Sequence, residues 1–197
     1  MRAAGRIVVI LAVFAGLSLT AAWAAAQEGS VERPFAPGRL VRMDLSAGDY
    51  TIAAGRDDRI LVRWETPSAE DAARAKVDIQ TQGSAATITT RGPHDNFRVV
   101  IELPARADLH ADLSAGNLRI RGITGNKDVG SWAGNIDIQI GRGDEYALID
   151  TAVKAGEIRA RTLNVSKGGL FRSFTWKGPG RHTLRVRLTA GNLRLLE

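Results

Sequence analysis

Leu113-Ser-Ala-Gly-Asn-Leu-Arg-Ile120 is one of five copies of a motif that decides how this chain folds. In each copy an Ala-Gly pair precedes one polar residue, and the residues that follow alternate between apolar and polar. The other copies lie at residues 45–52, 131–138, 153–160 and 188–195. A repeated unit of a glycine turn and an alternating strand is typical of β-strands that stack on one another.

The spacing of the motifs predicts how the strands stack. The alanines of the Ala-Gly pairs are separated by 68, 18, 22 and 35 residues. Gaps of 18 and 22 each match one coil of a β-solenoid, 68 is close to three coils, and 35 is one coil plus a hairpin protruding at residues 167–180. We therefore predict an all-β, single-domain β-solenoid or β-roll of stacked short strands, with about 18–22 residues per coil. Because Glu197 comes just after a motif strand, we expect an uncapped final coil, whose edge another subunit could cover. The alternative is an antiparallel sandwich with similar hairpin arms.

Alternation within the motifs separates an inner row of side chains from an outer row. The apolar residues after each turn are predicted to face the core: Leu118, Ile120, Ile136, Ile138, Ile158, Ala160, Leu193 and Leu195. Between them, Arg119, Asp137 and Arg159 are predicted to form an outer ladder whose charge alternates from coil to coil.

Two other segments give clear local predictions. Trp64 alternates with Ile60 and Val62, which places it in the core. Residues 68–76 depart from the strand pattern, because they are rich in helix formers and Ser68 is a suitable N-cap. We predict one short helix near residues 68–76 that packs on the strands.

The first 26 residues are predicted to be a cleaved signal peptide. Arg2 and Arg6 precede an apolar stretch, and Ala24-Ala25-Ala26 supplies the small residues that signal peptidase needs. The alternative is an uncleaved anchor helix, because about 20 apolar residues can span a bilayer. After cleavage we expect a linker at residues 27–37, a β-strand repeat domain at residues 38–197 and no stable membrane span.

Composition excludes several classes of function. The chain has no Cys, which excludes disulfides and thiolate chemistry. Its formal net charge of +6 is a mild surplus that does not predict a nucleic-acid partner. The three His residues lie far apart, and His94-Asp95-Asn96 is typical of a turn. No nucleophile, phosphate-loop or zinc motif is present, so we predict no catalytic residue, no metal and no cofactor.

Four residues are candidate ligand contacts. Trp132 and Trp176 offer aromatic faces on which a sugar ring can stack, and Arg119 and Arg159 belong to a basic strip that suits an anionic partner. Each has a plainer interpretation, as a Trp that covers a sheet edge or as an Arg in a solvated ion pair that contributes at most about 1 kcal/mol. We expect function to lie chiefly where the repeat is interrupted, at residues 167–180.

The order of these motifs resembles that of the exported DUF4097-type putative adhesins, a bacterial β-strand repeat family. The resemblance covers residues 38–197 and rests on the five Ala-Gly motifs, the strand Val99-Val-Ile-Glu-Leu-Pro104 and the turn Trp176-x-Gly-x-Gly180. It implies an elongated β-solenoid or β-roll outside the cytoplasm and supplies no catalytic residue.

These observations together predict an exported, non-enzymatic protein, periplasmic or at the cell surface. It is expected to act as a binding, adhesion or structural module whose partner is an envelope protein or a polysaccharide. One alternative is a protein that binds or cleaves envelope polysaccharide, which would show a groove with converging carboxylates and an exposed Trp. The other is a regulatory partner in an envelope-stress system, which would present one flat apolar patch.

Overall fold

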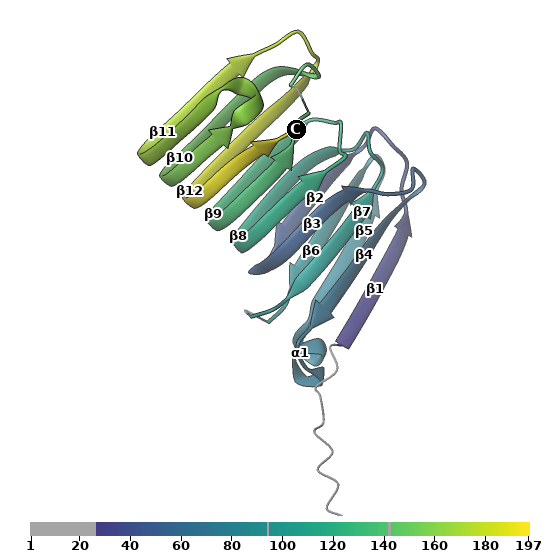
Figure 1. The fold of residues 1–197 in the computed structure, drawn as a ribbon. Coiled ribbons are helices and arrows are strands. Elements are labelled where there is room, and N and C mark those ends of the chain that lie inside the picture. The colour runs from purple at the N-terminus through teal and green to yellow at the C-terminus, as the bar shows by residue number, and fades with distance from the viewer. Residues whose placement is uncertain (1–26, 94, 142) are drawn as a thin grey trace, which may run out of the picture.

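The computed structural model describes residues 27–93, 95–141 and 143–197. The predicted signal peptide, residues 1–26, lies outside the described residues. The described chain forms one 12-stranded sheet with one short α-helix, so the all-β prediction is confirmed. Figure 1 shows the strands side by side in a stack that runs from β1 at one end to β11 at the other.

The strands are short near the N-terminus and long near the C-terminus. In chain order the elements are β1 (Gln27–Pro34), β2 (Leu40–Leu45), β3 (Gly48–Ala54), β4 (Arg59–Thr66), α1 (Ala69–Arg74), β5 (Lys76–Gln82), β6 (Ala85–Arg91), β7 (Arg98–Leu103), β8 (Asp108–Arg121), β9 (Lys127–Gln139), β10 (Tyr146–Ala160), a 3-10 turn (Arg161–Leu163), β11 (Val165–Lys177) and β12 (His182–Leu196).

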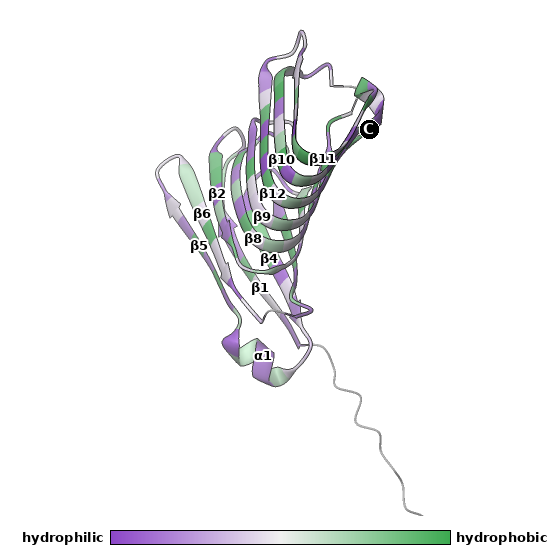
Figure 2. Ribbon diagram, turned by 90° about the vertical axis from the view of Figure 1, so that its left-hand side faces the viewer, coloured by the Kyte–Doolittle hydropathy of each residue, from purple (hydrophilic) through white to green (hydrophobic). Residues whose placement is uncertain are grey.

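Four long strands, β8, β9, β12 and β10, each contain one Ala-Gly motif and are nested in parallel bends (Figure 2). The motif glycines pair in register: Gly116 with Gly134, Gly134 with Gly191, and Gly191 with Gly156. β2 and β3 continue this pattern as two separate strands, because Gly48 pairs with Gly116. Each motif is therefore the corner of one level of the stack, with a first arm before the corner and a second arm after it.

The corner requires glycine for two reasons. Gly134 has a φ of +124°, a backbone conformation that residues with a side chain rarely adopt. A Cβ atom at Gly134 would also lie 1.7 Å from the carbonyl oxygen of Gly116 in the neighbouring corner. The same separation of 1.7 Å applies between Gly191 and Gly134 and between Gly156 and Gly191. Successive corners thus approach each other more closely than any other residue would allow.

A ladder of side-chain amides runs beside the glycines. Asn117 Nδ2 donates to Asp49 Oδ1 at 2.6 Å, Asn135 Nδ2 donates to Asn117 Oδ1 at 2.9 Å, and Asn192 Nδ2 donates to Asn135 Oδ1 at 3.0 Å. An amide carries both donors and an acceptor, so identical residues in register satisfy one another. The polar position of the motif therefore helps to hold the strands in register.

The order of the strands in the stack differs from their order in the chain. β12, which carries the last motif, lies between β9 and β10, so the prediction of an uncapped final coil is wrong. Residues 167–180 do not protrude as a hairpin, because most of them belong to β11, an antiparallel edge strand beside β10. After β9 the chain leaves the neighbouring position in the sheet open and forms the antiparallel pair β10–β11. β12 then occupies that position, between β9 and β10.

The gap of 68 residues between the first two motifs is not three coils. Gly48 and Gly116 are direct neighbours, and the intervening chain builds the other end of the stack. There β6 pairs with β2 and β7 with β3, both in parallel. β5 then pairs with β6, β4 with β7 and β1 with β4, all antiparallel. Residues 27–34, expected to belong to a linker, form strand β1.

The inner faces of the two arms form one hydrophobic core. All eight apolar residues that were predicted to face inward are buried. Trp64 is half-buried and packs against this core. The predicted helix is confirmed as α1, although it is shorter, and Ser68 Oγ caps it by accepting the N–H of Asp71 at 3.1 Å.

One cation is enclosed with the core residues. Lys127 is 1% exposed, and its Nζ donates to Tyr146 Oη at 2.6 Å and to the carbonyl oxygen of Gly125 at 2.9 Å. Burial lowers the pKa of Lys127 to about 8, although the nearby carboxylates of Glu145 and Asp108 oppose the change. Burial also raises the pKa of Tyr146 well above its usual value. The ammonium group therefore destabilises the folded state near neutral pH.

Candidate functional site

An open groove crosses the outer face of the second arm near the β1 end of the stack. It has a volume of about 670 Å³ and is lined by residues of β1, β4, β7, β3 and β8. Five neighbouring strands give it a length of about 19 Å at a strand spacing of about 4.8 Å. Its charged lining residues are Glu28, Asp49, Arg63, Glu65, Arg98 and Arg119.

Strand register explains why these side chains share one face. Residues that are paired across neighbouring strands form a row, and all side chains of one row point to the same side of the sheet. Two such rows line the groove. The first row contains Glu28, Glu65, Arg98 and Asp49. The second row contains Ser30, Arg63, Val100, Thr51 and Arg119. The groove therefore combines residues that are far apart in the sequence.

Two guanidinium groups in the groove are available to a ligand. Arg63 forms an ion pair with Glu102, and Asp49 accepts a hydrogen bond from Asn117. Arg98 and Arg119 form no side-chain hydrogen bond or ion pair with any other described residue. Three guanidinium groups and three carboxylates line the groove, so its formal charges balance.

The carboxylates of the groove converge at its β1 end. Glu28 and Glu65 are directly opposite in the β1–β4 register and lie on the same face. Both residues are exposed to solvent. An exposed pair lacks the apolar enclosure that a glycosidase general acid requires. The arrangement is therefore better suited to accepting hydrogen bonds than to protonating a leaving group.

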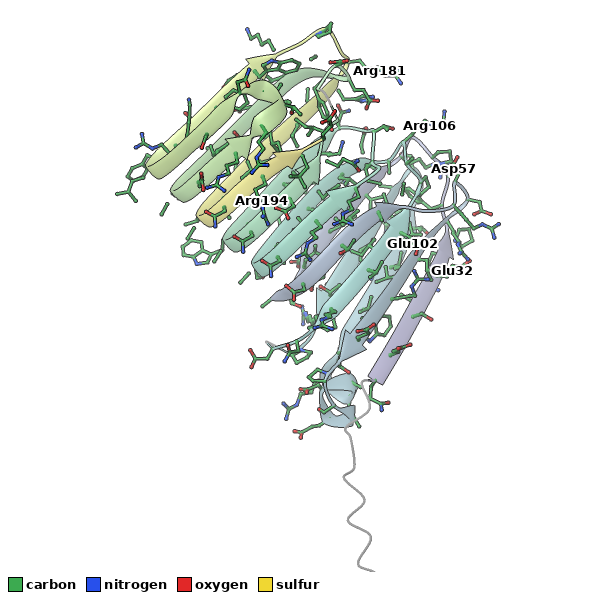
Figure 3. The ribbon with its side chains drawn as sticks, viewed as in Figure 1. Glu32, Asp57, Glu102, Arg106, Arg181 and Arg194 are labelled. Atoms are coloured by element: carbon green, nitrogen blue, oxygen red, sulfur yellow. The ribbon has the colours of Figure 1, made fainter. Side chains whose placement is uncertain are left out.

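The predicted outer ladder has a fourth member. Because β12 lies between β9 and β10, Arg194 separates Asp137 from Arg159, and the predicted alternation of charge is wrong at this step, where two arginines are neighbours. Arg194, labelled on β12 in Figure 3, donates from Nε and Nη2 to the two Asp137 oxygens at 2.7 and 2.9 Å. Arg159 Nε donates instead to Glu157 on its own strand at 2.5 Å. Of the candidate residues Arg119 and Arg159, only Arg119 lines the groove.

The two candidate tryptophans are in different environments, and neither lines the groove. Trp132 lies at the corner of β9, and 70% of its surface is exposed. Trp176 on β11 is half-buried and packs against the core at the end of the stack. The structure therefore does not bring the four sequence-predicted contacts into one site.

The described residues contain no group of three or more His, Asp or Glu side chains that could hold a metal ion. His94 lies outside the described residues. His110 stands between two carboxylates, with Nε2 3.2 Å from Asp112 and Nδ1 3.6 Å from Asp128. Within the described part of the chain, no helix is both long enough and apolar enough to cross a membrane.

The sequence did not single out Glu28, Arg63, Glu65 or Arg98 as site residues. Each occupies an ordinary outward position on an alternating strand, and only the strand register places them together. Because β1 and β4 join the stack antiparallel and out of chain order, no local signal in the sequence indicates that register.

No family model and no curated protein matches this chain. The fold is similar to the solved structure of a "putative cell adhesion protein" from Clostridium sporogenes, with 12% sequence identity and a TM-score of 0.56, covering 86% of this chain and 99% of that chain. A "putative adhesin" from Parabacteroides distasonis matches with 10% identity and a TM-score of 0.28, covering 86% of this chain and 70% of that chain. The first likeness shows a shared β-strand fold, and identities this low show nothing beyond the fold.

Proposed function

We propose that this protein is an exported, non-enzymatic binding module of the cell envelope and that its groove holds an envelope polysaccharide. The observation that supports the proposal most strongly is the open groove in which Arg98 and Arg119 are unpaired beside exposed carboxylates. Sugar hydroxyls both donate and accept hydrogen bonds; guanidinium groups supply the complementary donors and carboxylates the complementary acceptors.

The shape and charge of the groove favour one ligand class. A groove about 19 Å long that is open to solvent suits a stretch of polymer rather than a small molecule held in a closed pocket. Its balanced charge suits a polymer that is mainly hydroxylated rather than strongly anionic or cationic. Val100, which is 37% exposed, adds apolar surface to the lining.

Binding is favoured over cleavage because Glu28 and Glu65 are exposed. The predicted signal peptide at residues 1–26 supports export, and the motif order supports kinship with the DUF4097-type family. The structural likeness to a "putative cell adhesion protein" agrees with a role in the envelope.

The proposal is tested by isothermal titration of the purified protein with envelope polysaccharides of different charge. We expect a mainly hydroxylated polymer to bind, and Arg98→Ala and Arg119→Ala each to weaken binding at least tenfold. A hydrogen bond that involves a charged group contributes about 1.5–3 kcal/mol, and about 1.4 kcal/mol corresponds to a factor of ten.

Arg74→Ala is the matched control, because Arg74 is an exposed arginine on α1 that lies outside the groove. The affinity of the Arg74→Ala variant for the polysaccharide is expected to equal that of the wild type. If no polysaccharide binds, or if the two groove variants retain full affinity, the groove is not the ligand site and the proposal fails. Hydrolysis of the bound polymer would instead establish the enzymatic alternative.

A further inference from the structure

The row of corners from β9 to β11, called here the β11 corner, carries the three most exposed large hydrophobic side chains among the described residues. Trp132 is 70% exposed, Leu170 is 66% exposed and Phe171 is 80% exposed. Isolated exposed hydrophobic residues are common on proteins, whereas a cluster marks a surface that contacts a partner.

Strand register shows that these side chains belong to one edge. Trp132 is flanked by residues that pair with Leu188 and Ala190 of β12, which places it opposite Thr189. By the same reasoning Thr189 is opposite Lys154 of β10, and Lys154 is opposite Phe171 of β11. Trp132 and Phe171 are therefore three strands apart, about 14 Å, with Leu170 next to Phe171.

Basic side chains surround this corner. Lys167, Phe171 and Arg172 line one shallow hollow on β11 together with Gly168, Ser166 and Ser173, and no carboxylate lines it. Lys167 Nζ donates to the carbonyl oxygen of Ser173 at 2.9 Å, and Arg172 Nε donates to that of Gly168 at 2.7 Å. Neither cation is neutralised by an acidic side chain, since no ion pair in the described structure includes either residue.

The backbone at Phe171 gives an independent indication. Phe171 has a φ of +51°, which is uncommon for a bulky residue and costs on the order of 1 kcal/mol. Residues held in such conformations cluster at functional sites.

We propose that this corner docks on an anionic lipid surface. In this arrangement Trp132, Leu170 and Phe171 enter the interfacial region, while Lys154, Lys167 and Arg172 meet the phosphate groups. Aromatic and basic side chains are the residues that favour this interface. The nearest acidic side chain of β10, Glu157, is engaged by Arg159 and does not oppose the contact.

A second copy of the chain is a poorer occupant of this edge. β11 contains Lys167, Arg172 and Lys177 and no acidic residue, so pairing β11 with itself would bring like charges together. The lipid proposal concerns strands β9 to β11, none of which lines the groove, and does not depend on the polysaccharide proposal.

The test is co-sedimentation of the purified protein with vesicles. We expect binding to vesicles of 30 mol% phosphatidylglycerol in phosphatidylcholine, little binding to pure phosphatidylcholine, and loss of binding in high salt. Lys167→Gln and Arg172→Gln should each weaken binding about fivefold, the effect of removing one basic residue near an anionic surface. Arg74→Gln, on α1 far from the corner, is the control and should bind as the wild type does.

Phe171→Gly separates docking from folding. It removes the ring and relieves the positive φ, so thermal stability should be unchanged or higher while vesicle binding falls about tenfold or more. Full binding by a folded Phe171→Gly variant would overturn the proposal. So would equal binding to both kinds of vesicle, or selective binding to an acidic polysaccharide with none to vesicles.

Discussion

Replacing Lys127 by Met together with Tyr146 by Phe is expected to abolish a rise in stability between pH 7.5 and 9.5. In the folded protein burial lowers the pKa of Lys127 to about 8, whereas a lysine in the unfolded chain has a pKa of about 10.4. Between these values the unfolded chain binds a proton that the folded chain has released. The free energy of unfolding therefore increases with pH across this window.

The size of the effect follows from the two pKa values. They imply a gain of about 2 kcal/mol between pH 7.5 and 9.5, which corresponds to about 4–8 °C in melting temperature for a domain of this size. Above about pH 10 the trend reverses, because the raised pKa of Tyr146 means that the folded state keeps a proton which the unfolded state loses.

Urea unfolding followed by Trp fluorescence at the two pH values measures this difference. The double variant removes the buried donor and its phenolic partner at once, so its stability at pH 7.5 should equal or exceed that of the wild type. Subtracting the variant's pH dependence removes the contributions of all other titrating groups. Identical pH dependence in the two proteins would show that Lys127 is not buried as a cation near neutral pH, and the reasoning would be refuted.

Three further predictions concern the corners and the helix cap. Gly134→Ala should destabilise the fold by about 3 kcal/mol or more, because it combines a positive φ with a Cβ atom 1.7 Å from a neighbouring carbonyl oxygen. Thermal melts measure the loss, and Gly168→Ala is the control because the space around its Cβ position is open. Asn135→Leu should destabilise by about 1–3 kcal/mol by breaking both rungs of the amide ladder, and a loss below about 0.5 kcal/mol in urea unfolding would count against the ladder. Ser68→Ala should remove about 1 kcal/mol through loss of the N-cap, measured in the same assay, and an unchanged stability would contradict the capping role.

Local features of this fold could be predicted from the sequence, whereas the order of the strands could not. The alternation after each corner correctly placed Ile136, Ile138 and Leu193 in the core, because side-chain direction depends only on strand parity. The spacing between motifs in the sequence did not indicate which strands are neighbours in the sheet. β12 pairs with β9 over a sequence separation of 57 residues, as the Arg194–Asp137 hydrogen bond shows. The motifs are nearly identical, so each fits next to any other, and the sequence contains no local signal for their order.

The same limit applied to the candidate sites. Arg119 was identified because it belongs to a motif, whereas Arg98 lies on β7, outside the repeats, and joins the groove only through register with β3 and β4. Trp132 is 70% exposed, in agreement with the polar residues that occupy its position in the other motifs, although the glycine corner breaks the alternation that would have placed it. Trp176 was ambiguous because β11 is an edge strand whose alternate residues cover the end of the core.

Each of the two surfaces proposed to bind ligands combines strands of the repeat with strands outside it, and the pairing of charges gives a reason. In the parallel central levels some outward charges pair across strands: Arg194 with Asp137, which is in register with it, and Arg187 with Asp150, which lies two residues away from its register partner Ala152. Strands outside the repeat adjoin it at both ends, β7 in parallel with β3 and β11 antiparallel to β10, and on these strands Arg98, Lys167 and Arg172 remain without an acidic partner among the described residues. The groove extends from β1 to β8, whereas Lys167, Phe171 and Arg172 lie on β11, four strands or about 19 Å beyond β8. A polymer in the groove and a lipid surface at β11 therefore contact different strands, which would let one molecule bind both at the same time.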